Sequence, residues 1–379
     1  MDWNFILFSV VKIVGVVFLA VLPMVAYSVL AERKISAWIQ DRVGPNRTAL
    51  PFVGKIPVIG PFLISLGIFQ PIADGLKLFL KEDFTPAHVR KGYFWIAPAV
   101  AMAPSLMTVA VIPFGSMLGA QKMVIADLNV GILYTFGIVS LAVYGIVLAG
   151  YAANSKYPFL GGIRASAQMI SYEIAMGLSV VSLFMLMGDP ALASKLSTTW
   201  QNFLAGTSSL NLGRVVAYQS QSVFDWLIFK QPIAFVIFLV AAFAETNRLP
   251  FDMAESETEL VGGYHTEYSS MKFGLFFLGE YAAMIAASAL MVTLFLGGWT
   301  LPIGGLNEPA TSMAVGVAQI AIFVAKLLGF MVVFIWVRWM LPRFRYDQLM
   351  DLGWRRFIPV ALANILITAV VLWVRSASK

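Results

Sequence analysis

Acidic side chains are concentrated in one segment of this chain, residues 244–281, which lies between two strongly apolar stretches. The segment holds seven of the twenty Asp and Glu residues: Glu245, Asp252, Glu255, Glu257, Glu259, Glu267 and Glu280. Carboxylates beside a membrane are costly to keep ionised, because a low dielectric constant disfavours the charged form. The concentration therefore predicts proton handling or ion coupling rather than packing.

The rest of the chain is hydrophobic, with a mean hydropathy of +0.81, 59% apolar residues and only 12% charged residues. Its length of 379 residues would allow two soluble domains. However, apolar runs of about twenty residues recur, which is the length that crosses a hydrocarbon core of ~30 Å. The pattern predicts an all-α polytopic membrane protein with a single transmembrane domain over residues 1–379.

Eight transmembrane helices are expected, several with internal prolines that neighbouring helices can accommodate. They cover residues 5–30, 95–117, 130–153, 167–187, 226–244, 275–296, 314–339 and 357–373. The first run is too long for a signal peptide and lacks a cleavage site, so we interpret it as a transmembrane helix.

Basic residues predict how these helices are oriented. The loops after the first, third, fifth and seventh helices hold 18 Lys and Arg residues. This number includes Arg338, which lies next to the last of these loops. The loops and termini on the opposite side of the membrane hold seven. Since basic residues accumulate in cytoplasmic loops, we expect these loops in the cytoplasm and both termini outside. The same rule explains the net charge of +6, so no nucleic-acid partner is predicted.

The chain contains no cysteine, which excludes disulfides and cysteine-ligated iron–sulfur clusters. Its two histidines, His88 and His265, lie outside the expected helices, which excludes paired-histidine haem ligation in the bilayer. We also find no flavin site and no NADH-binding fingerprint. Any electron transfer must therefore use the redox centres of a partner or a diffusible carrier.

A shorter amphipathic helix is predicted at residues 70–81, with Pro71 in its first turn. Its apolar side chains share one face, and Asp74, Lys77 and Lys81 share the other. This pattern is typical of a helix lying in the membrane interface, with a re-entrant or core helix as the alternative. Either arrangement places Asp74 next to Lys77, at i,i+3.

Three carboxylates are expected at a common depth on three helices. Glu245 ends the fifth helix, whereas Glu280 and Glu173 lie about five and six residues inside the sixth and fourth, or roughly 8–9 Å deep. Lys326 should lie ~20 Å deep, near the mid-plane. Such groups are candidates for function, although Glu173 or Glu280 could instead accept hydrogen bonds that hold the helices together.

The acidic loop contains Glu255, Glu257 and Glu259, spaced two residues apart. On a helix the first and last would share a face, whereas in an irregular loop all three could line one water-filled funnel. Like charges held this close push some carboxyl pKa values upward, which favours proton exchange over a merely solvated loop. Nearby His265 is a candidate proton donor or, equally, a surface histidine.

Five long stretches resemble the H subunit of respiratory complex I, the proton-pumping NADH:quinone oxidoreductase. They are residues 32–47 (ERKISAWIQDRVGPNR), 70–83 (QPIADGLKLFLKED), 164–173 (RASAQMISYE), 245–268 (ETNRLPFDMAESETELVGGYHTEY) and 336–353 (WVRWMLPRFRYDQLMDLG). The stretches follow the family's order, and the resemblance covers essentially the whole chain.

The resemblance implies a membrane subunit, not catalytic alone, that anchors the peripheral cluster-bearing arm in the lipid bilayer. It would form most of a chamber for ubiquinone or menaquinone, which is the substrate, and would bind no flavin, haem or iron–sulfur cluster itself. Its partners would include the small and antiporter-like membrane subunits. Its location would be the bacterial inner membrane or an equivalent energy-coupling membrane.

Individual residues take roles from the same resemblance. Glu32 and Arg33 would lie beside the quinone entrance, Asp74 and Lys77 would form a pair on the interfacial helix, and Arg248 belongs to the ETNR motif. For Arg33 and Arg248, at helix ends, snorkelling is the ordinary explanation. The proton path would comprise Glu173, Glu245, Glu255, Glu257, Glu259 and Glu280, with Lys326 and His265 as further candidates.

Two departures and three alternatives qualify the resemblance. Leu249 stands where the family often has alanine, and an extra segment, residues 50–61, alters the shape near the quinone entrance. A subunit of a ferredoxin-dependent photosynthetic quinone reductase or of a membrane-bound hydrogenase would share the fold, but the ETNR and GPNR stretches favour the respiratory enzyme. A stand-alone transporter is disfavoured, because no internal repeat is found.

Overall fold

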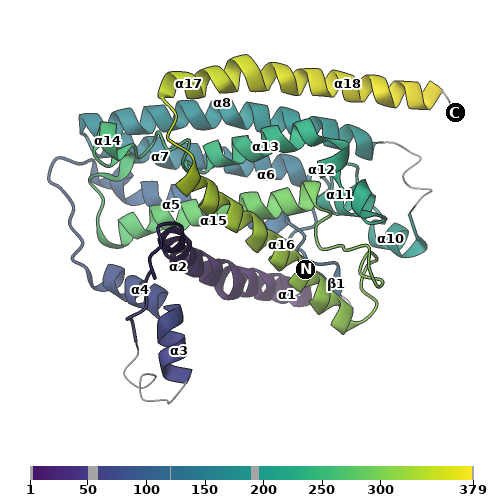
Figure 1. The fold of residues 1–379 in the computed structure, drawn as a ribbon, viewed down its shortest axis with the longest axis horizontal. Helices are drawn as coiled ribbons and strands as arrows, with labels where there is room; N and C mark the ends of the chain where they lie inside the picture. The colour runs from purple at the N-terminus through teal and green to yellow at the C-terminus, as the bar shows by residue number, and fades with distance from the viewer. Residues whose placement is uncertain (1–2, 50–58, 120, 189–195, 378–379) are drawn as a thin grey trace.

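A computed structural model describes residues 3–49, 59–119, 121–188 and 196–377. Figure 1 shows long helices lying side by side in one bundle, with a smaller helical arm projecting from it. The strands in the described residues, β1 (Met117–Leu118) and β2 (Gln121–Lys122), form one short antiparallel hairpin. The prediction of an all-α polytopic membrane protein is confirmed.

Seven helices in the described residues are long and apolar enough to cross a membrane. They are α1–η1–α2 (Trp3–Val14, Gly15–Val21, Leu22–Ile39), α5–η3 (Lys91–Thr108, Val109–Val111), α6–α7 (Gly131–Val139, Leu141–Ala152), α8 (Lys156–Met187), α15 (Ser270–Phe295), α16 (Met313–Met340) and α17–η6–α18 (Tyr346–Asp351, Leu352–Phe357, Ile358–Ala377). Each corresponds to one of the expected helices. The predicted ends differ most for α8 and the last helix, which both begin eleven residues earlier than expected.

The expected fifth helix, residues 226–244, is not continuous. Its first turn is the short α12 (Leu227–Lys230), and α13 (Pro232–Glu245) begins after a break at Gln231, whose φ and ψ are −134° and 59°. Pro232 suits the first helical position because its missing N–H needs no partner there. With 14 residues, α13 is about 21 Å long, which is shorter than a hydrocarbon core.

The projecting arm consists of α3 (Ile59–Leu66) and α4 (Gln70–Leu80), which meet at an angle of 66°. Gly67 makes the bend with a φ of +71°, and a Cβ there would lie 2.6 Å from the Pro45 carbonyl oxygen. The predicted amphipathic helix is confirmed as α4, and its apolar side chains Phe79 and Leu80 are exposed. Most of the extra segment, residues 50–58, lies outside the described residues.

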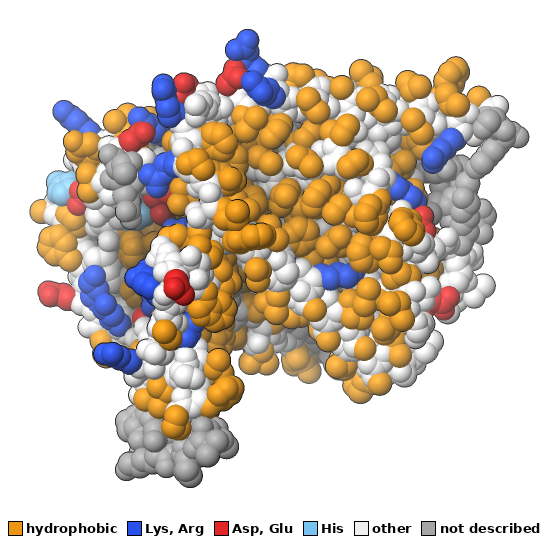
Figure 2. Space-filling model, in the orientation of Figure 1, with side chains coloured by type: hydrophobic (Ala, Val, Ile, Leu, Met, Phe, Trp, Pro, Cys, Tyr) orange, Lys and Arg blue, Asp and Glu red, His pale blue; other side chains and the backbone are white. Residues whose placement is uncertain are grey.

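The other short helices connect the long ones. They are α10 (Thr198–Phe203), α11 (Leu212–Tyr218), η4 (Val223–Asp225), α14 (Glu257–Leu260) and η5 (Gly263–His265). Figure 2 shows hydrophobic side chains covering most of the visible bundle surface, with charged side chains gathered mainly toward the end that carries α4 and α14. An apolar outer surface with charges at the ends is what a lipid environment requires.

Close helix contact depends on small residues at the centre of the bundle. Gly145 of α7 lies so near α5 that an added Cβ would be 2.4 Å from the Ala101 backbone nitrogen. Small residues of this kind allow membrane helices to approach closely, where packing rather than the hydrophobic effect provides the stability.

Gly145→Ala should therefore destabilise the protein by roughly 1–3 kcal/mol, because the α5 backbone must move away. The thermal midpoint of the purified protein complex measures this. Gly177→Ala on α8 is the matched control, since an added Cβ there meets no atom within 4 Å. Equal midpoints for the two variants would contradict the packing argument.

Candidate functional site: a charged cluster beside a large cavity

A buried charged cluster joins three helices and the acidic loop. Glu32 of α2 accepts hydrogen bonds from the Tyr281 hydroxyl, at 2.6 Å, and from Nη1 of Arg248, at 3.2 Å. Its other carboxylate oxygen pairs with Arg338 of α16. On the far side of the cluster, Nε of Arg248 lies 2.7 Å from Oε1 of Glu280.

Charge balance explains why this cluster can be buried. Two carboxylates, Glu32 and Glu280, face two guanidinium groups, and the Arg248 guanidinium also lies 4.3 Å from the centre of the Tyr281 ring. Burial alone would lower the pKa of Arg248, but Glu280, Tyr281 and Glu32 raise it above its ordinary value. The side chain of Arg248 is only 4% exposed, so it does not snorkel to the surface.

A cavity of about 830 Å³ opens beside the cluster. Its walls come from α2, α4, the start of α15 and the end of α16. Four of the five residues predicted for a quinone chamber line it: Glu32, Arg33, Asp74 and Lys77. Arg248, the fifth, lies behind Glu32. The remaining wall is largely apolar and includes Val25, Val29, Leu78, Phe79, Phe273, Phe277 and Leu278. This volume suits a ligand of substantial size.

The pairing of charges along the cavity differs from the expected one. Asp74 bonds to Arg33, at 2.7 Å, and accepts from the Gln70 side chain at 2.9 Å. Lys77 also lines the cavity but makes no ion pair within the described residues. The expected Asp74–Lys77 pair is therefore replaced by Arg33–Asp74, because α4 lies against α2 and presents Asp74 to it.

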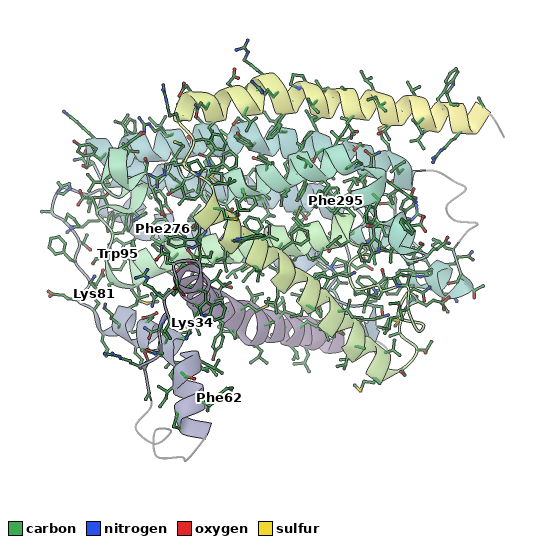
Figure 3. The ribbon with its side chains drawn as sticks, in the orientation of Figure 1. Lys34, Phe62, Lys81, Trp95, Phe276 and Phe295 are labelled. Carbon is green, nitrogen blue, oxygen red and sulfur yellow. The ribbon has the colours of Figure 1, made fainter. Side chains whose placement is uncertain are left out.

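Ser270, the first residue of α15, holds α4 in place. Its hydroxyl lies 3.0 Å from the carbonyl oxygens of both Leu78 and Lys81, which end α4. Nearby, Lys272 forms an ion pair with Asp83 at 3.0 Å. Figure 3 shows Lys34, Lys81, Trp95 and Phe276 at this end of the bundle, whereas Phe295 lies toward the other end of α15. These contacts attach one wall of the cavity to the helix that carries Glu280.

Within the described side chains of the acidic loop, Glu255 and Glu259 lie in different surroundings and do not share one funnel. Oε1 of Glu255 lies 3.6 Å from Nδ1 of His265, whereas Glu259 pairs with Arg164, at 2.5 Å, on the exposed side. Glu257 begins the short helix α14, and its side chain lies outside the described part. Because Glu255 and Glu259 have different surroundings, they cannot act as equivalent groups.

Burial sets the protonation of this loop. It raises the pKa of Glu255 well above its ordinary value, and the charges of Glu280 and Asp252 raise it further. Burial also lowers the pKa of His265 to about 4. At neutral pH His265 is thus a neutral imidazole in a ring of aromatic side chains, Phe273 and Phe277 among them, rather than a surface histidine.

Glu173 and Glu245 form a second acidic group. Glu245 ends α13 and lines a small interior cavity, and it lies close enough to Glu173 of α8 for the two charges to repel. Glu280, in contrast, is engaged by Arg248. The three carboxylates expected at one depth therefore belong to two different environments.

Lys326 lies in the middle of α16, and its hydrogen bonds involve none of these acids. Its ammonium group donates to the carbonyl oxygens of Leu296, Gly298 and Thr300, at 2.7, 3.0 and 2.8 Å. It also lies 4.7 Å from the Trp226 ring. Leu296 caps α15, and Gly298 and Thr300 lie in the loop that follows it, so Lys326 attaches the end of α15 and this loop to α16.

Sequence reasoning missed three members of the site. Tyr281 and Arg338 bind Glu32, and Arg343 pairs with Asp252 at 2.9 Å. The sequence contained a clue to these three residues. Tyr281 directly follows Glu280, and both arginines lie in the WVRWMLPRFRYD segment. No spacing rule connects that segment to Glu32, about 300 residues earlier in the chain.

Taken together, the fold and the site define a multi-pass α-helical membrane protein with a large cavity beside a buried ion cluster. The chain matches the family described as NADH dehydrogenase over residues 11–369. It is 45% identical to the NADH-quinone oxidoreductase H subunit of Flavobacterium psychrophilum, covering 98% of this chain and 99% of the relative. The H subunit numbered 2 of the Geobacter sulfurreducens enzyme is 47% identical, with 95% of each chain covered.

The chain belongs to the H-subunit family of NADH-quinone oxidoreductases, and the resemblance inferred from the sequence is confirmed. It is a subunit of an oxidoreductase complex and not catalytic alone.

The neutral state of His265 predicts a pH effect on the loop. The pKa of His265 is about 4 in the folded loop and ~6.5 in the opened loop. Between these two pH values, the opened loop binds one more proton than the folded loop. The folded loop therefore loses stability through His265 as the pH falls. Between pH 7 and pH 5, His265 alone should lower the local stability by about 2 kcal/mol relative to a variant that lacks it. His265→Gln should remove this contribution, so its pH dependence should differ from that of the wild type by this amount, as measured by amide hydrogen exchange across residues 262–268 after correction for intrinsic rates.

His88→Gln is the matched control, because His88 is half-exposed and lies 3.8 Å from Glu267. Glu255 titrates in both variants, and its raised pKa acts in the opposite direction, so the comparison isolates His265. Identical pH slopes in wild type and His265→Gln would refute the burial argument.

Proposed function

We propose that this chain forms the quinone chamber of a proton-pumping NADH:quinone oxidoreductase and couples quinone reduction to proton translocation. The observation that carries the proposal is the direct contact between the cavity wall and the buried ion cluster: Glu32 lines the cavity and also binds Arg248, which binds Glu280. A charge change in the cavity can therefore alter the cluster without passing through solvent.

The cavity suits a quinone for a physical reason. A quinone has an apolar tail and a polar ring, and this cavity combines a mostly apolar wall with the charged groups of Arg33, Asp74 and Lys77. Reduction of the ring to a quinol takes up two electrons and two protons. The electrons must come from redox centres of other subunits, because this chain has no cysteine to ligate a cluster.

The coupling step follows from the charges. When the ring takes up protons, the field at Glu32 changes, and the balance among Glu32, Arg248 and Glu280 shifts with it. Glu255, with its raised pKa, is the neighbouring group suited to exchange a proton in response. Glu173 and Glu245 would change their protonation in turn, farther along the proton path. Glu257 and Glu259 would set the local electrostatic potential of the loop.

The same proposal includes the orientation of the chain in the membrane and its neighbouring subunits. The basic loops face the cytoplasm and both termini lie outside, in a bacterial inner membrane or an equivalent energy-coupling membrane. The peripheral cluster-bearing arm sits over the end that carries α4 and α14, and antiporter-like subunits continue the membrane arm. We assign Lys326 to closing the end of α15 rather than to the proton path, because its donors are directed at three carbonyl oxygens.

Glu280→Gln tests the coupling role. The substitution removes a charge but keeps a hydrogen-bonding group, so the complex should assemble while quinone reduction or proton pumping falls about tenfold, a change of ~1.4 kcal/mol. Activity and pumping of the purified complex in proteoliposomes measure this. The matched control is Glu308→Gln, in the loop before α16. Wild-type rates and pumping stoichiometry for Glu280→Gln would disprove the relay.

Asp74→Asn tests the chamber. Loss of the ion pair with Arg33 should raise the KM for quinone severalfold, because the charge pattern along the cavity wall changes. Steady-state kinetics with a water-soluble quinone measure this. Asp83→Asn serves as the control, since Asp83 pairs with Lys272 near the end of α4 but does not line the cavity. If Asp74→Asn alters only assembly, the pair is a structural clamp.

A further inference from the structure

The projecting arm carries a helix, α3, that is apolar on every side. It contains no charged residue, and from Pro61 to Leu66 none of its side chains is buried against the rest of the chain. Phe62 is 61% exposed, Leu66 is 44% exposed, and Figure 3 shows Phe62 on the arm, away from the bundle. A helix that is apolar all round needs an apolar environment, because exposing such a surface to water is unfavourable.

The polar groups near the end of α3 have partners within the chain. The Ser65 hydroxyl donates to the Phe62 carbonyl oxygen at 2.7 Å. The Gly67 N–H donates to the Ile64 carbonyl oxygen at 2.9 Å. From α2, Nζ of Lys34 donates to the Ser65 carbonyl oxygen at 2.8 Å. These groups therefore need no water, which is the condition for placing a helix end among lipids.

The contact with Lys34 sets the level of α3 in the membrane. The apolar stretch that ends with α2, Ser9–Ile39, has 31 residues, or roughly 45 Å, which matches a bilayer with its headgroups. Lys34 lies five residues before the end of α2, or ~7.5 Å back along the helix. Trp38, between them, is 65% exposed, which is typical of aromatic residues at the headgroup level. The end of α3 therefore lies near the boundary between headgroups and acyl chains.

We propose that α3 is an interfacial anchor, inserted among the acyl chains of the lipid leaflet beside the bundle. Lipid fits better than a partner protein, because a protein groove covers one side of a helix whereas hydrocarbon surrounds it, and α3 is apolar on all sides. Figure 1 shows α3 running across the direction of the long helices, as a helix in the membrane plane does. The Lys34 ammonium, which has no carboxylate partner within the described residues, lies at the level of the negatively charged lipid phosphates.

An anchored α3 also holds α4 at the membrane surface. The two helices are joined through the bend at Gly67, and α4 forms one wall of the large cavity. On α4, Leu76 is 56% exposed and Leu80 is 85% exposed, so the apolar surface of the arm continues along this helix. The anchor needs no quinone and no proton transfer, so it is independent of the proposed function.

A photoreactive diazirine that partitions into the bilayer tests this contact without any substitution. In the intact complex, in proteoliposomes of phosphatidylethanolamine and phosphatidylglycerol, it should label Phe62 and Leu66 at least about fivefold more than Val261, as measured by mass spectrometry. Val261 is the matched control, because it is apolar and 65% exposed but lies in the acidic loop. Labelling of α3 no stronger than that of Val261 would overturn the proposal, and it is the result expected if water or a neighbouring subunit covers α3.

A cross-linking variant identifies what α3 touches. Phe62→benzoylphenylalanine keeps an aromatic side chain that, on irradiation, bonds to a neighbouring C–H group. Mass spectrometry of this chain from the irradiated complex should find a phospholipid adduct. An adduct with another subunit, or none, would overturn the proposal. Val261→benzoylphenylalanine is the control, and a phospholipid adduct of equal yield there would also overturn it. If the Phe62 variant does not assemble, Leu66→benzoylphenylalanine on the same helix replaces it.

Discussion

The ion pairs of Glu32 with Arg248 and Arg338 are the interaction on which the rest of this structure depends. They join α2, the acidic loop and α16 at one buried point, and Tyr281 adds α15 through its hydroxyl group. Removing one partner of a buried pair typically costs 3–5 kcal/mol, because the other charge is left uncompensated. The large cavity opens directly beside this point, so its shape and its charge pattern depend on the same contacts.

Low dielectric constant explains how the protein distributes its charges. Carboxylates inside the bundle either meet a guanidinium group, as Glu280 does, or line a small cavity, as Glu245 does. Glu259, on the exposed side, needs only a surface pair with Arg164. Each acid therefore has the surroundings that its depth requires. The acidic loop, which first appeared as one group of similar residues, contains at least two kinds of site.

Two sets of side-chain contacts attach the ends of α15 to its neighbours. Lys326 closes the end of α15 with three hydrogen bonds, and Ser270 fixes the start of the same helix to α4. The helix that carries Glu280 is therefore attached at both ends. The shortness of α13 places Glu245 inside the bundle, where it reaches the small cavity.

The sequence by itself determined the membrane class, the amphipathic helix α4, the family and four of the six charged residues that line the large cavity. These depend on local composition, periodicity and contiguous motifs, which need no knowledge of distant contacts. Only the tertiary structure decided that Asp74 pairs with Arg33, that Glu32 meets Arg248 and Arg338, and that Lys326 binds carbonyl oxygens. The physical reason is that ion-pair partners are selected by helix packing: Glu32 and Arg338 are 306 residues apart in the chain, and no local pattern relates them.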